Sequence, residues 1–404
     1  MNILMVTDVS ITNILGGAER VLYEESTRLA LRGHAVHVLT RRLPYHGSDV
    51  ENINGVEEYR YNFQEKLFPF FFKSILSDCR RAFRSLEENF PFDIINFHQP
   101  FSALGVLSSI SSRKVPLVYT CHSLSFEEYI SRSFSPKNPI KLLLHHLQVI
   151  ARKYTEKNVL KRSDRIVVLS EYTGEELQRT YGLSSSKVSV IPGGVDLERF
   201  RPSTDKDRIR ARMGLPEDKL ILFTVRNLVP RMGLENLISA FEIAQNGRRD
   251  LLLVIGGEGP LEPALNEQTR RCGVEEFVRF VGYIPDEDLP SYYQMADLFI
   301  LPTKELEGFG LVTVEALASG LPVFGTPVGG TKEILTKLGP NYLFNDSTPE
   351  SMATTILKAL NDWGKNSSAY KAISKTCRQV AEEHYSWENH VSKLEKVFYS
   401  MIGN

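Results

Sequence analysis

The feature that most constrains the fold is a series of short apolar runs separated by helix-like stretches. The first run, Ile3–Val6, stops at Thr7 and Asp8, and a segment with apolar residues at helical spacing follows it. Strands without a polar face are typical of a parallel sheet that helices cover on both sides. The runs that we expect to be strands are Ile3–Val6, Gly33–Leu39, Asp93–Phe97, Pro116–Thr120, Arg165–Leu169, Val188–Ile191, Lys219–Val225, Leu251–Ile255, Val278–Val281, Leu298–Leu301 and Pro322–Phe324. This alternation predicts an α/β fold.

A turn-rich stretch, Pro192–Asp196 followed by Phe200–Pro202, interrupts the alternation, which then restarts at Lys219. The 404 residues also exceed one ordinary domain. We therefore place a first domain at residues 1–192 and a second from residue 193. Ligands of such sheets bind at the carboxyl ends of the strands, so we expect a crevice between the two domains.

Composition and charge narrow the class of protein. The formal net charge is −1, which gives no overall attraction to nucleic acid. Residues 1–190 are more basic, with 24 Lys and Arg against 20 Asp and Glu, and the excess is greatest in residues 66–165. The 4 cysteines lack metal spacing, and neither a signal peptide nor a membrane-spanning run stands out, so we expect a cytoplasmic protein.

Glycines, cations and histidines follow several of the predicted strands. Gly16 and Gly17 lie between the first strand and a helix, where a backbone can approach an anion, although the G-x-G-x-x-G pattern is absent. Arg226 follows a strand directly and begins a loop that also contains Arg231. His98 and His122 also follow strands. A lone histidine is more often structural, but two at the carboxyl ends of neighbouring strands would both point into one cleft.

Two carboxylates flank a helix start, because Glu307 precedes the predicted helix and Glu315 lies within it. We expect this helix to begin at Phe309 or Gly310 and to run through Ala318. Glu315 then lies roughly 7–9 Å along the helix, which suits a ligand longer than one sugar ring. A glycosidase is the least favoured interpretation, because its two carboxylates must flank a single bond.

The residues Asp286 and Asp288 resemble a D-x-D metal motif. They stand before an apolar periodic run, so we interpret them as the acidic start of a helix. We predict no metal site there.

Taken together, the motifs resemble the retaining glycosyltransferases of family 4, over essentially the whole chain. The family's E-x7-E element is matched by Glu307 and Glu315. The other matching segments are Gly16–Glu19, Arg32–His34, Ser163–Val168, Pro192–Asp196, Phe200–Pro202, Gly256–Pro260 and Gly320–Val323. The resemblance implies the GT-B fold, with two Rossmann-like parallel-sheet domains facing a central cleft.

The resemblance also implies roles for individual residues. Glu315 would bind the ribose of a nucleotide-sugar donor, Glu307 would face the donor sugar, and Arg226 would bind its phosphates. The residues that we expect to be catalytic are His122, Glu307 and Arg226. The residues that we expect to contact the substrate are Gly16, Gly17, Arg226, Arg231, Gly257, Glu307, Gly308, Phe309, Gly310, Leu311, Val312 and Glu315.

One position departs from the family pattern. The family usually has a lysine before the glycine that is Gly233 here, whereas this chain has Met232. A thioether cannot stabilise phosphate charge. Either Arg231 replaces the lysine, which we favour because a guanidinium binds phosphate in a bidentate way, or Arg226 acts with backbone donors alone.

The family further implies transfer with retention, without a metal or other cofactor, from a UDP-sugar or, as second choice, a GDP-sugar. The acceptor would be a hydroxyl of a glycan, a lipid-linked molecule or a small molecule. A sugar-nucleotide epimerase and a catalytically weak donor-binding scaffold remain alternatives. We expect a monomer or homodimer whose second domain ends at residue 385. A C-terminal helix over about residues 386–404 would pack Trp387 and Phe398 onto the first domain.

Two apolar segments of the first domain are followed by basic residues. One is Leu67–Leu76, before Arg80, Arg81 and Arg84. The other is Pro139–Leu147, before Arg152, Lys153, Lys157, Lys161 and Arg162. Such segments could rest peripherally on the inner face of an anionic membrane. The alternative is that they are amphipathic helices packed on the sheet with basic outer faces.

Overall fold

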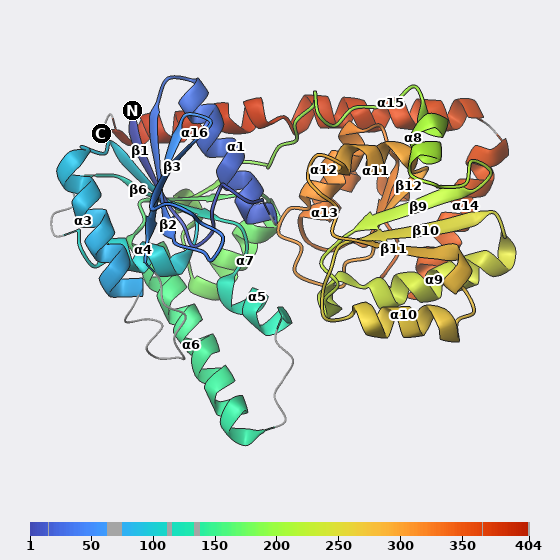
Figure 1. Ribbon diagram of the computed structural model, residues 1–404, viewed down its shortest axis with the longest axis horizontal. Coiled ribbons are helices and arrows are strands. Elements are labelled where there is room, and N and C mark those ends of the chain that lie inside the picture. The colour runs from blue at the N-terminus through green and yellow to red at the C-terminus, as the bar shows by residue number, and fades with distance from the viewer. Residues whose placement is uncertain (15, 63–74, 111–114, 133–137, 366, 403–404) are drawn as a thin grey trace. The chain divides into compact units, whose positions relative to one another are not determined.

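The chain folds into two α/β units. Figure 1 shows a computed structural model, which describes residues 1–14, 16–62, 75–110, 115–132, 138–365 and 367–402. Unit 1 comprises Met1–Gly193 and Trp387–Asn404, and unit 2 comprises Gly194–Ser386. Of the apolar segment predicted at Leu67–Leu76, residues 67–74 lie outside the described part of the chain.

Unit 1 is built on an eight-stranded sheet in the order β3-β4-β2-β1-β5-β6-β7-β8. All neighbouring strands are parallel except the edge pair β3–β4. The strands are β1 (Asn2–Val6), β2 (Ala35–Arg41), β3 (Val50–Ile53), β4 (Val56–Tyr61), β5 (Ile94–Phe97), β6 (Leu117–Cys121), β7 (Arg165–Val168) and β8 (Val188–Val190). The hairpin β3–β4, which turns at Asn54 and Gly55, was not predicted from the sequence.

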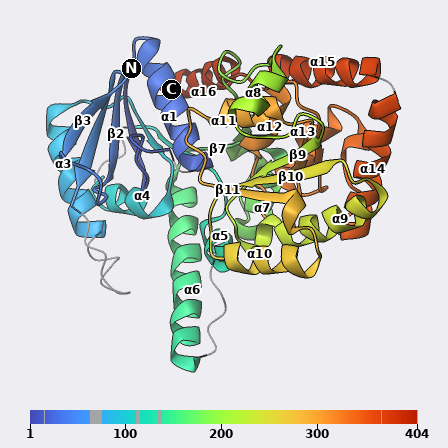
Figure 2. The same cartoon turned by 45° about the vertical axis from the view of Figure 1, so that its right-hand side comes forward.

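Helices cover both faces of this sheet. They are α1 (Gly17–Leu31), α3 (Arg80–Asn89), α4 (Pro100–Leu107), α5 (Ser125–Arg132), α6 (Pro139–Arg162), α7 (Glu171–Tyr181) and α16 (Trp387–Ile402), with a π-helical turn at Ile75–Cys79 and a 3₁₀ turn at Ser185–Lys187. In both views α1 and α16 lie side by side (Figures 1 and 2). Trp387 and Phe398 of α16 are buried, and Phe398 shares a core cluster with Ile3 and Leu22. The expectation that these two aromatic residues are core residues is therefore confirmed.

Unit 2 has a smaller, fully parallel sheet in the order β11-β10-β9-β12-β13. Its strands are β9 (Leu220–Val225), β10 (Leu251–Gly256), β11 (Val278–Gly282), β12 (Leu298–Leu301) and β13 (Val323–Gly325). Its helices are α8 (Lys206–Arg212), α9 (Leu234–Gly247), α10 (Glu262–Arg271), α11 (Leu289–Met295), α12 (Leu311–Ala318), α13 (Gly329–Thr336), α14 (Pro349–Lys365) and α15 (Ser367–His384), with 3₁₀ turns at Pro230–Met232, Glu275–Phe277 and Pro340–Tyr342. The predicted α/β architecture with two parallel-sheet domains is thus present.

The strands of unit 2 position its loops. Arg226 follows β9, Gly257 follows β10, and the segment that contains Glu307 lies between β12 and α12. Because all five strands run in the same direction, these loops gather at the carboxyl edge of the sheet.

Candidate functional site

Backbone segments approach one another closely at the carboxyl edge of the unit 2 sheet. Gly257 has a φ of +109°, and a Cβ atom there would lie 1.9 Å from the carbonyl oxygen of Arg226. The Arg226 amide in turn donates to the Gly256 carbonyl at 3.0 Å. Only glycine fits such an approach, so residue 257 sets the position of the Arg226 backbone.

The guanidinium of Arg226 is buried and has two partners. Its Nε and Nη2 atoms lie 3.3 and 2.8 Å from the sulfur of Met232, and Nη2 also donates to the Glu307 carboxylate. Met232 belongs to the core of unit 2, as expected for a packing residue. The sulfur therefore occupies one side of the arginine, and the carboxylate neutralises its charge.

The loop that carries Glu307 is fixed from several directions. Thr303 donates its hydroxyl to Glu307 Oε2 at 3.2 Å, and the Gly330 amide donates to the Glu307 carbonyl at 2.9 Å. Arg231 donates from Nη1 to the Leu306 carbonyl at 2.7 Å. Leu306 itself has a φ of +58°, an unfavourable conformation for a branched side chain, and such strain is typical of functional loops.

The start of α12 is a second built feature of this edge. The helix begins at Leu311, one residue later than the latest predicted start, and Gly310 with a φ of +93° precedes it. A Cβ atom at position 310 would lie 2.8 Å from Thr331 Oγ1 and 3.1 Å from Thr313 Oγ1. Both hydroxyl oxygens are buried and have no hydrogen-bond partner among the described residues. Two buried polar groups without partners, beside the free N–H groups of a helix start, are suited to hold an anionic oxygen.

Glu315 and Glu307 have different partners. Glu315, in the second turn of α12, accepts a hydrogen bond at Oε2 from the Tyr293 hydroxyl at 2.8 Å. Burial, followed by the charge of Glu315, raises the pKa of Tyr293 well above its usual range, so the phenol stays protonated and remains a donor. The two carboxylates are therefore not an acid–base pair in this structure.

Next to the helix start, the ring of Phe309 contacts that of Tyr385 edge to face at 5.9 Å.

The acidic pair that resembles a metal motif lies elsewhere in unit 2. Asp288 immediately precedes α11, as the sequence predicted, and Asp286 pairs with Arg199 at 2.8 Å.

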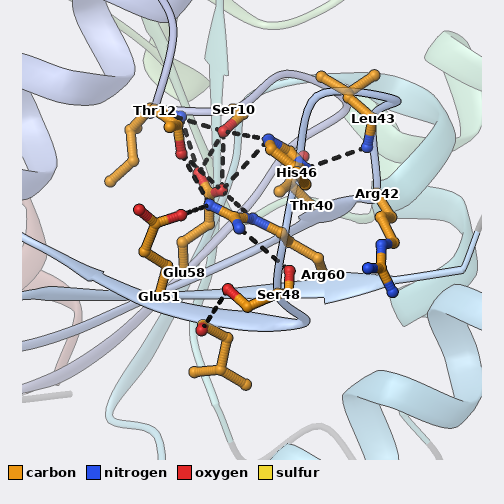
Figure 3. A network of polar contacts seen from close by, with 12 residues as sticks. Ser10, Thr12, Thr40, Arg42, Leu43, His46, Ser48, Glu51, Glu58 and Arg60 are labelled. Carbon is orange, nitrogen blue, oxygen red and sulfur yellow. Dashed lines mark hydrogen bonds and ion pairs between the residues drawn. The ribbon is translucent and has the colours of Figure 1, made fainter.

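In unit 1, Gly16 precedes α1 and Gly17 is its first residue. The loop that leads to them is anchored by the buried carboxylate of Glu58, which accepts from the Ser10 hydroxyl, the Ile11 amide and Arg60 Nε (Figure 3). Arg60 also donates to Thr12 Oγ1 at 2.8 Å and to a second carboxylate (Figure 3). A buried ion pair on β4 thus holds the glycine-bearing loop in place.

His46 closes this network and has a defined tautomer. Its Nδ1 accepts from the Leu43 amide at 3.0 Å, so the hydrogen is on Nε2, which lies 3.1 Å from Ser10 Oγ. Burial and then the Arg60 charge lower the pKa of His46, which keeps the ring neutral.

His122 lies immediately after β6 and contacts His98, which lies immediately after β5. The Nε2 atom of His122 is 3.2 Å from His98 Nδ1, and the two rings stack at 5.3 Å. Burial lowers the pKa of His122 to about 4 and lowers that of His98 well below its usual range. The two histidines that the sequence placed at neighbouring strand ends therefore do meet, as neutral rings.

Sequence reasoning missed several residues of these sites. In unit 2 they are the hydroxyls of Thr303, Thr313, Thr331 and Tyr293, and in unit 1 they are Glu58 and Arg60. One local signal was available: Gly329 and Gly330 precede Thr331 at the start of α13, which repeats the strand–glycine–helix pattern of the first loop.

Two Rossmann-like units in one chain, the second with a buried arginine and a helix start at its strand ends, define the GT-B fold. Sucrose-phosphate synthase from Thermosynechococcus elongatus superposes with a TM-score of 0.81 at 21% identity, covering 100% of both chains. The Anabaena protein HepE in complex with UDP-glucose gives 0.78 at 18% identity, covering 98% of this chain and 99% of that one.

Sequence comparison then identifies the family. Residues 15–199 match the family model for Glycosyltransferase Family 4, and residues 205–379 match that for Glycosyl transferases group 1. D-inositol 3-phosphate glycosyltransferase 2 of Catenulispora acidiphila is 30% identical over 298 residues, which are 70% of this chain and 67% of the relative. The chain therefore belongs to the family 4 glycosyltransferases, as its motifs indicated, and it is an enzyme of the glycosyltransferase class.

Proposed function

We propose that this enzyme transfers a hexose-type sugar from a nucleotide sugar to an acceptor hydroxyl, with retention of configuration and without a metal ion. A UDP-sugar is the favoured donor and a GDP-sugar the next. The similar Anabaena protein HepE, whose structure was solved in complex with UDP-glucose, supports a uridine donor. The acceptor is a hydroxyl of a glycan, a lipid-linked molecule or a small molecule.

The observation that carries this proposal is the pair of buried hydroxyls at the start of α12. The hydroxyls of Thr313 and Thr331 both lie within 3.1 Å of where a Cβ atom of residue 310 would stand, and neither oxygen has a hydrogen-bond partner among the described residues. An unsatisfied buried hydroxyl destabilises a protein unless something binds it. A diphosphate oxygen at the helix start would satisfy both hydroxyls and the N–H groups of Leu311 and Val312.

The proposed reaction uses these groups to stabilise the leaving group. The bond between the anomeric carbon and the phosphate oxygen breaks, and the acceptor oxygen bonds to that carbon from the same face. The acceptor proton goes to the departing phosphate. Negative charge grows on the diphosphate, where Arg226 and the N–H dipoles of α12 are already oriented. In this scheme Glu307 faces the sugar and Glu315 binds the ribose.

Conservative replacement of the two hydroxyls tests the proposal. In Thr313→Val and Thr331→Val, stability should stay equal or rise, because no protein hydrogen bond is lost. Affinity for the donor should fall in both, by roughly fivefold or more each. The control is Thr326→Val, since the Thr326 hydroxyl donates to the Thr303 carbonyl at 2.5 Å and its removal should lower stability.

Calorimetric titration with UDP- and GDP-sugars, beside chemical denaturation, measures both quantities. Unchanged affinity in both site variants would rule out a diphosphate at the α12 start. Product analysis with donor alone separates transfer from epimerisation. Affinity without turnover on any acceptor, or on water, would support a scaffold instead.

We also propose that α6 rests on an anionic membrane surface, which would suit a lipid-linked acceptor. The buried residues of α6 all lie in its second half, at Thr155, Glu156, Val159 and Leu160. Six of the large apolar side chains before them are 41% to 70% exposed, whereas Leu142 and Val149 are half-buried; the six are Ile140, Leu143, Leu144, Leu147, Ile150 and Tyr154. These residues recur at helical spacing, and α6 extends away from the unit 1 sheet in both views (Figures 1 and 2).

The charges on α6 favour an anionic lipid surface over a second protein. Its exposed basic residues are Lys141, Lys153, Lys157, Lys161 and Arg162, whereas its one acidic residue, Glu156, is fully buried. Apolar side chains flanked by lysines are typical of helices that lie in a bilayer interface. No helix in the described ranges is long and apolar enough to cross a bilayer.

Vesicle flotation tests the membrane contact. The enzyme should float with vesicles that contain phosphatidylglycerol, less so at high salt, and not with pure phosphatidylcholine. The double change Leu143→Glu with Leu147→Glu should abolish flotation, whereas Leu31→Glu, at an exposed leucine of α1, should not. Equal flotation of the double variant, or salt-independent self-association through α6, would contradict this proposal.

A further inference from the structure

Four side chains of unit 1, three of them buried, form a series of polar contacts that ends at the partly buried His122. Glu25 of α1 lies between two histidines: its Oε1 is 2.9 Å from Nε2 of His390 on α16, and its Oε2 is 3.5 Å from Nε2 of His98. His98 in turn contacts His122. The side chains of Glu25, His98 and His390 are completely shielded from solvent. This series of contacts links α16 to His122, the histidine after β6.

The His390–Glu25 end of the series holds one shared proton. The Nδ1 atom of His390 lies 2.8 Å from the Pro192 carbonyl, which can only accept, so this nitrogen carries a hydrogen. A second hydrogen must lie between His390 Nε2 and Glu25 Oε1. Whether the pair is imidazolium with carboxylate or two neutral groups, its net charge is zero. His390 therefore compensates the charge of a buried carboxylate.

The other end of the series sets the tautomers of two neutral rings. Asn96 accepts at Oδ1 from the Thr120 hydroxyl and presents its NH₂ group to His98 Nε2 at 3.1 Å. His98 then carries its hydrogen on Nδ1 and donates it to His122 Nε2. His122 must in consequence carry its own hydrogen on Nδ1. That nitrogen is buried and has no hydrogen-bond partner among the described residues.

We propose that Glu25 and His390 are positioning residues that determine which nitrogen of His122 carries the hydrogen, acting through His98. If Glu25 lost its compensating partner, its Oε2 atom would carry a buried charge beside His98 Nε2. This charge would draw the His98 hydrogen from Nδ1 to Nε2. His122 would then donate from Nε2, and its Nδ1 would become a bare acceptor.

The consequence for activity rests on the proposed function. The family resemblance implies that His122 is catalytic, and in the proposed reaction its Nδ1–H group would donate to a substrate oxygen that a bare nitrogen would repel. The tautomer itself can be observed without any substrate. Failure of the transfer proposal and failure of this inference are therefore separable.

Nitrogen NMR of the full-length, histidine-labelled enzyme without ligand tests the inference. Ring correlations report which nitrogen carries the hydrogen, and His122→Gln identifies the signals of His122 by their loss. In the wild type, His122 should have the Nδ1–H form. His390→Gln, which keeps a polar side chain but removes the compensating charge, should convert it to the Nε2–H form.

The double variant Glu25→Gln with His390→Gln supplies the decisive comparison. It contains no uncompensated charge, so His122 should return to the Nδ1–H form. A merely structural role predicts that the double variant is at least as perturbed as the single one. Turnover should follow the tautomer, falling roughly tenfold in His390→Gln and recovering in the double variant, a size typical of residues that orient a functional histidine.

The matched control is Glu24→Gln on the same helix. Glu24 is also buried, but it pairs with Arg20 and Arg28, away from the histidines. This variant should leave the His122 tautomer unchanged. The inference is overturned if His390→Gln leaves the tautomer unchanged, if the double variant does not restore it, or if Glu24→Gln shifts it equally.

Discussion

Removing the negative charge of Glu307 from its ion pair with Arg226 should change stability and ligand affinity in opposite directions. The side chains of Arg226 and Glu307 are only 6% and 11% exposed. Among the described residues, Glu307 is the only one whose carboxylate contacts the Arg226 guanidinium. Glu307→Gln keeps the shape and a hydrogen-bond acceptor but removes the negative charge. The guanidinium then faces a neutral amide and the sulfur of Met232.

The expected loss of stability is about 3 kcal/mol. Breaking a buried pair by removing one partner costs about 3–5 kcal/mol, and two charges about 4 Å apart at an effective dielectric constant near 20 interact by about 4 kcal/mol. The acceptor that glutamine retains places the value at the lower end. In this variant, no carboxylate would compete with a nucleoside diphosphate for the Arg226 guanidinium. The affinity of the diphosphate should rise by about fivefold, which corresponds to about 1 kcal/mol.

Urea unfolding and calorimetric titration with UDP and GDP measure the two effects. Turnover should fall, because Glu307 is proposed to face the sugar. Glu267→Gln is the control, since Glu267 and its partner Arg270 are both more than half exposed, and it should change stability by no more than about 0.5 kcal/mol. If affinity for the diphosphate falls together with stability, then Glu307 holds Arg226 in its binding position and the reasoning is wrong.

Three further predictions concern backbone, ribose contact and pH. Gly257→Ala should cost about 3 kcal/mol and weaken diphosphate binding, because its Cβ would displace the Arg226 carbonyl, whereas Gly273→Ala, with open space around it, should cost only about 1–2 kcal/mol in urea unfolding. Glu315→Ala should weaken donor binding more than it lowers turnover, and equal small effects on both would contradict its assignment to the ribose. Burial raises the pKa of Glu156 to about 7, so its neutral form is favoured in the folded state. Stability from this group is complete below the unfolded pKa near 4.5 and is lost, by about 3 kcal/mol, as the pH rises to about 7. The urea midpoint of the wild type should fall as the pH rises across this range, whereas that of Glu156→Gln should not show this fall.

Much of the fold could be predicted because burial of a parallel strand is a local property of the sequence. The runs at Ile3–Val6 and Leu251–Ile255 are apolar on both faces, and both are strands. The hairpin β3–β4 was not predicted because its strands carry charges that only the folded protein neutralises, such as Glu58 and Arg60. Its one local signal was Asn54 followed by Gly55, a pair that favours a tight hairpin turn.

The candidate sites divide in the same way. Glycines and charged residues directly after strands, such as Arg226 and Gly257, could be found because strand ends gather at one edge of a parallel sheet. The contact of Glu25 with His390 joins residues 365 positions apart, and no local pattern indicates it. The role of Met232 could be predicted only in part. Its departure from the family pattern was clear from the sequence, but the contact of its sulfur with Arg226 became apparent only in the structure.

The return of the chain to unit 1 at Trp387 has a consequence for biosynthesis. Unit 2 is continuous in sequence, so the ribosome can release everything it needs to fold while α16 is still being made. Unit 1 cannot do the same, because Val391, Leu394 and Phe398 belong to a core cluster that they share with residues of its first strands and first helix. Until α16 has been made, the apolar side chains of unit 1 in this cluster lack the contacts that α16 supplies. The half of the enzyme that is synthesised first is therefore the half that finishes folding last.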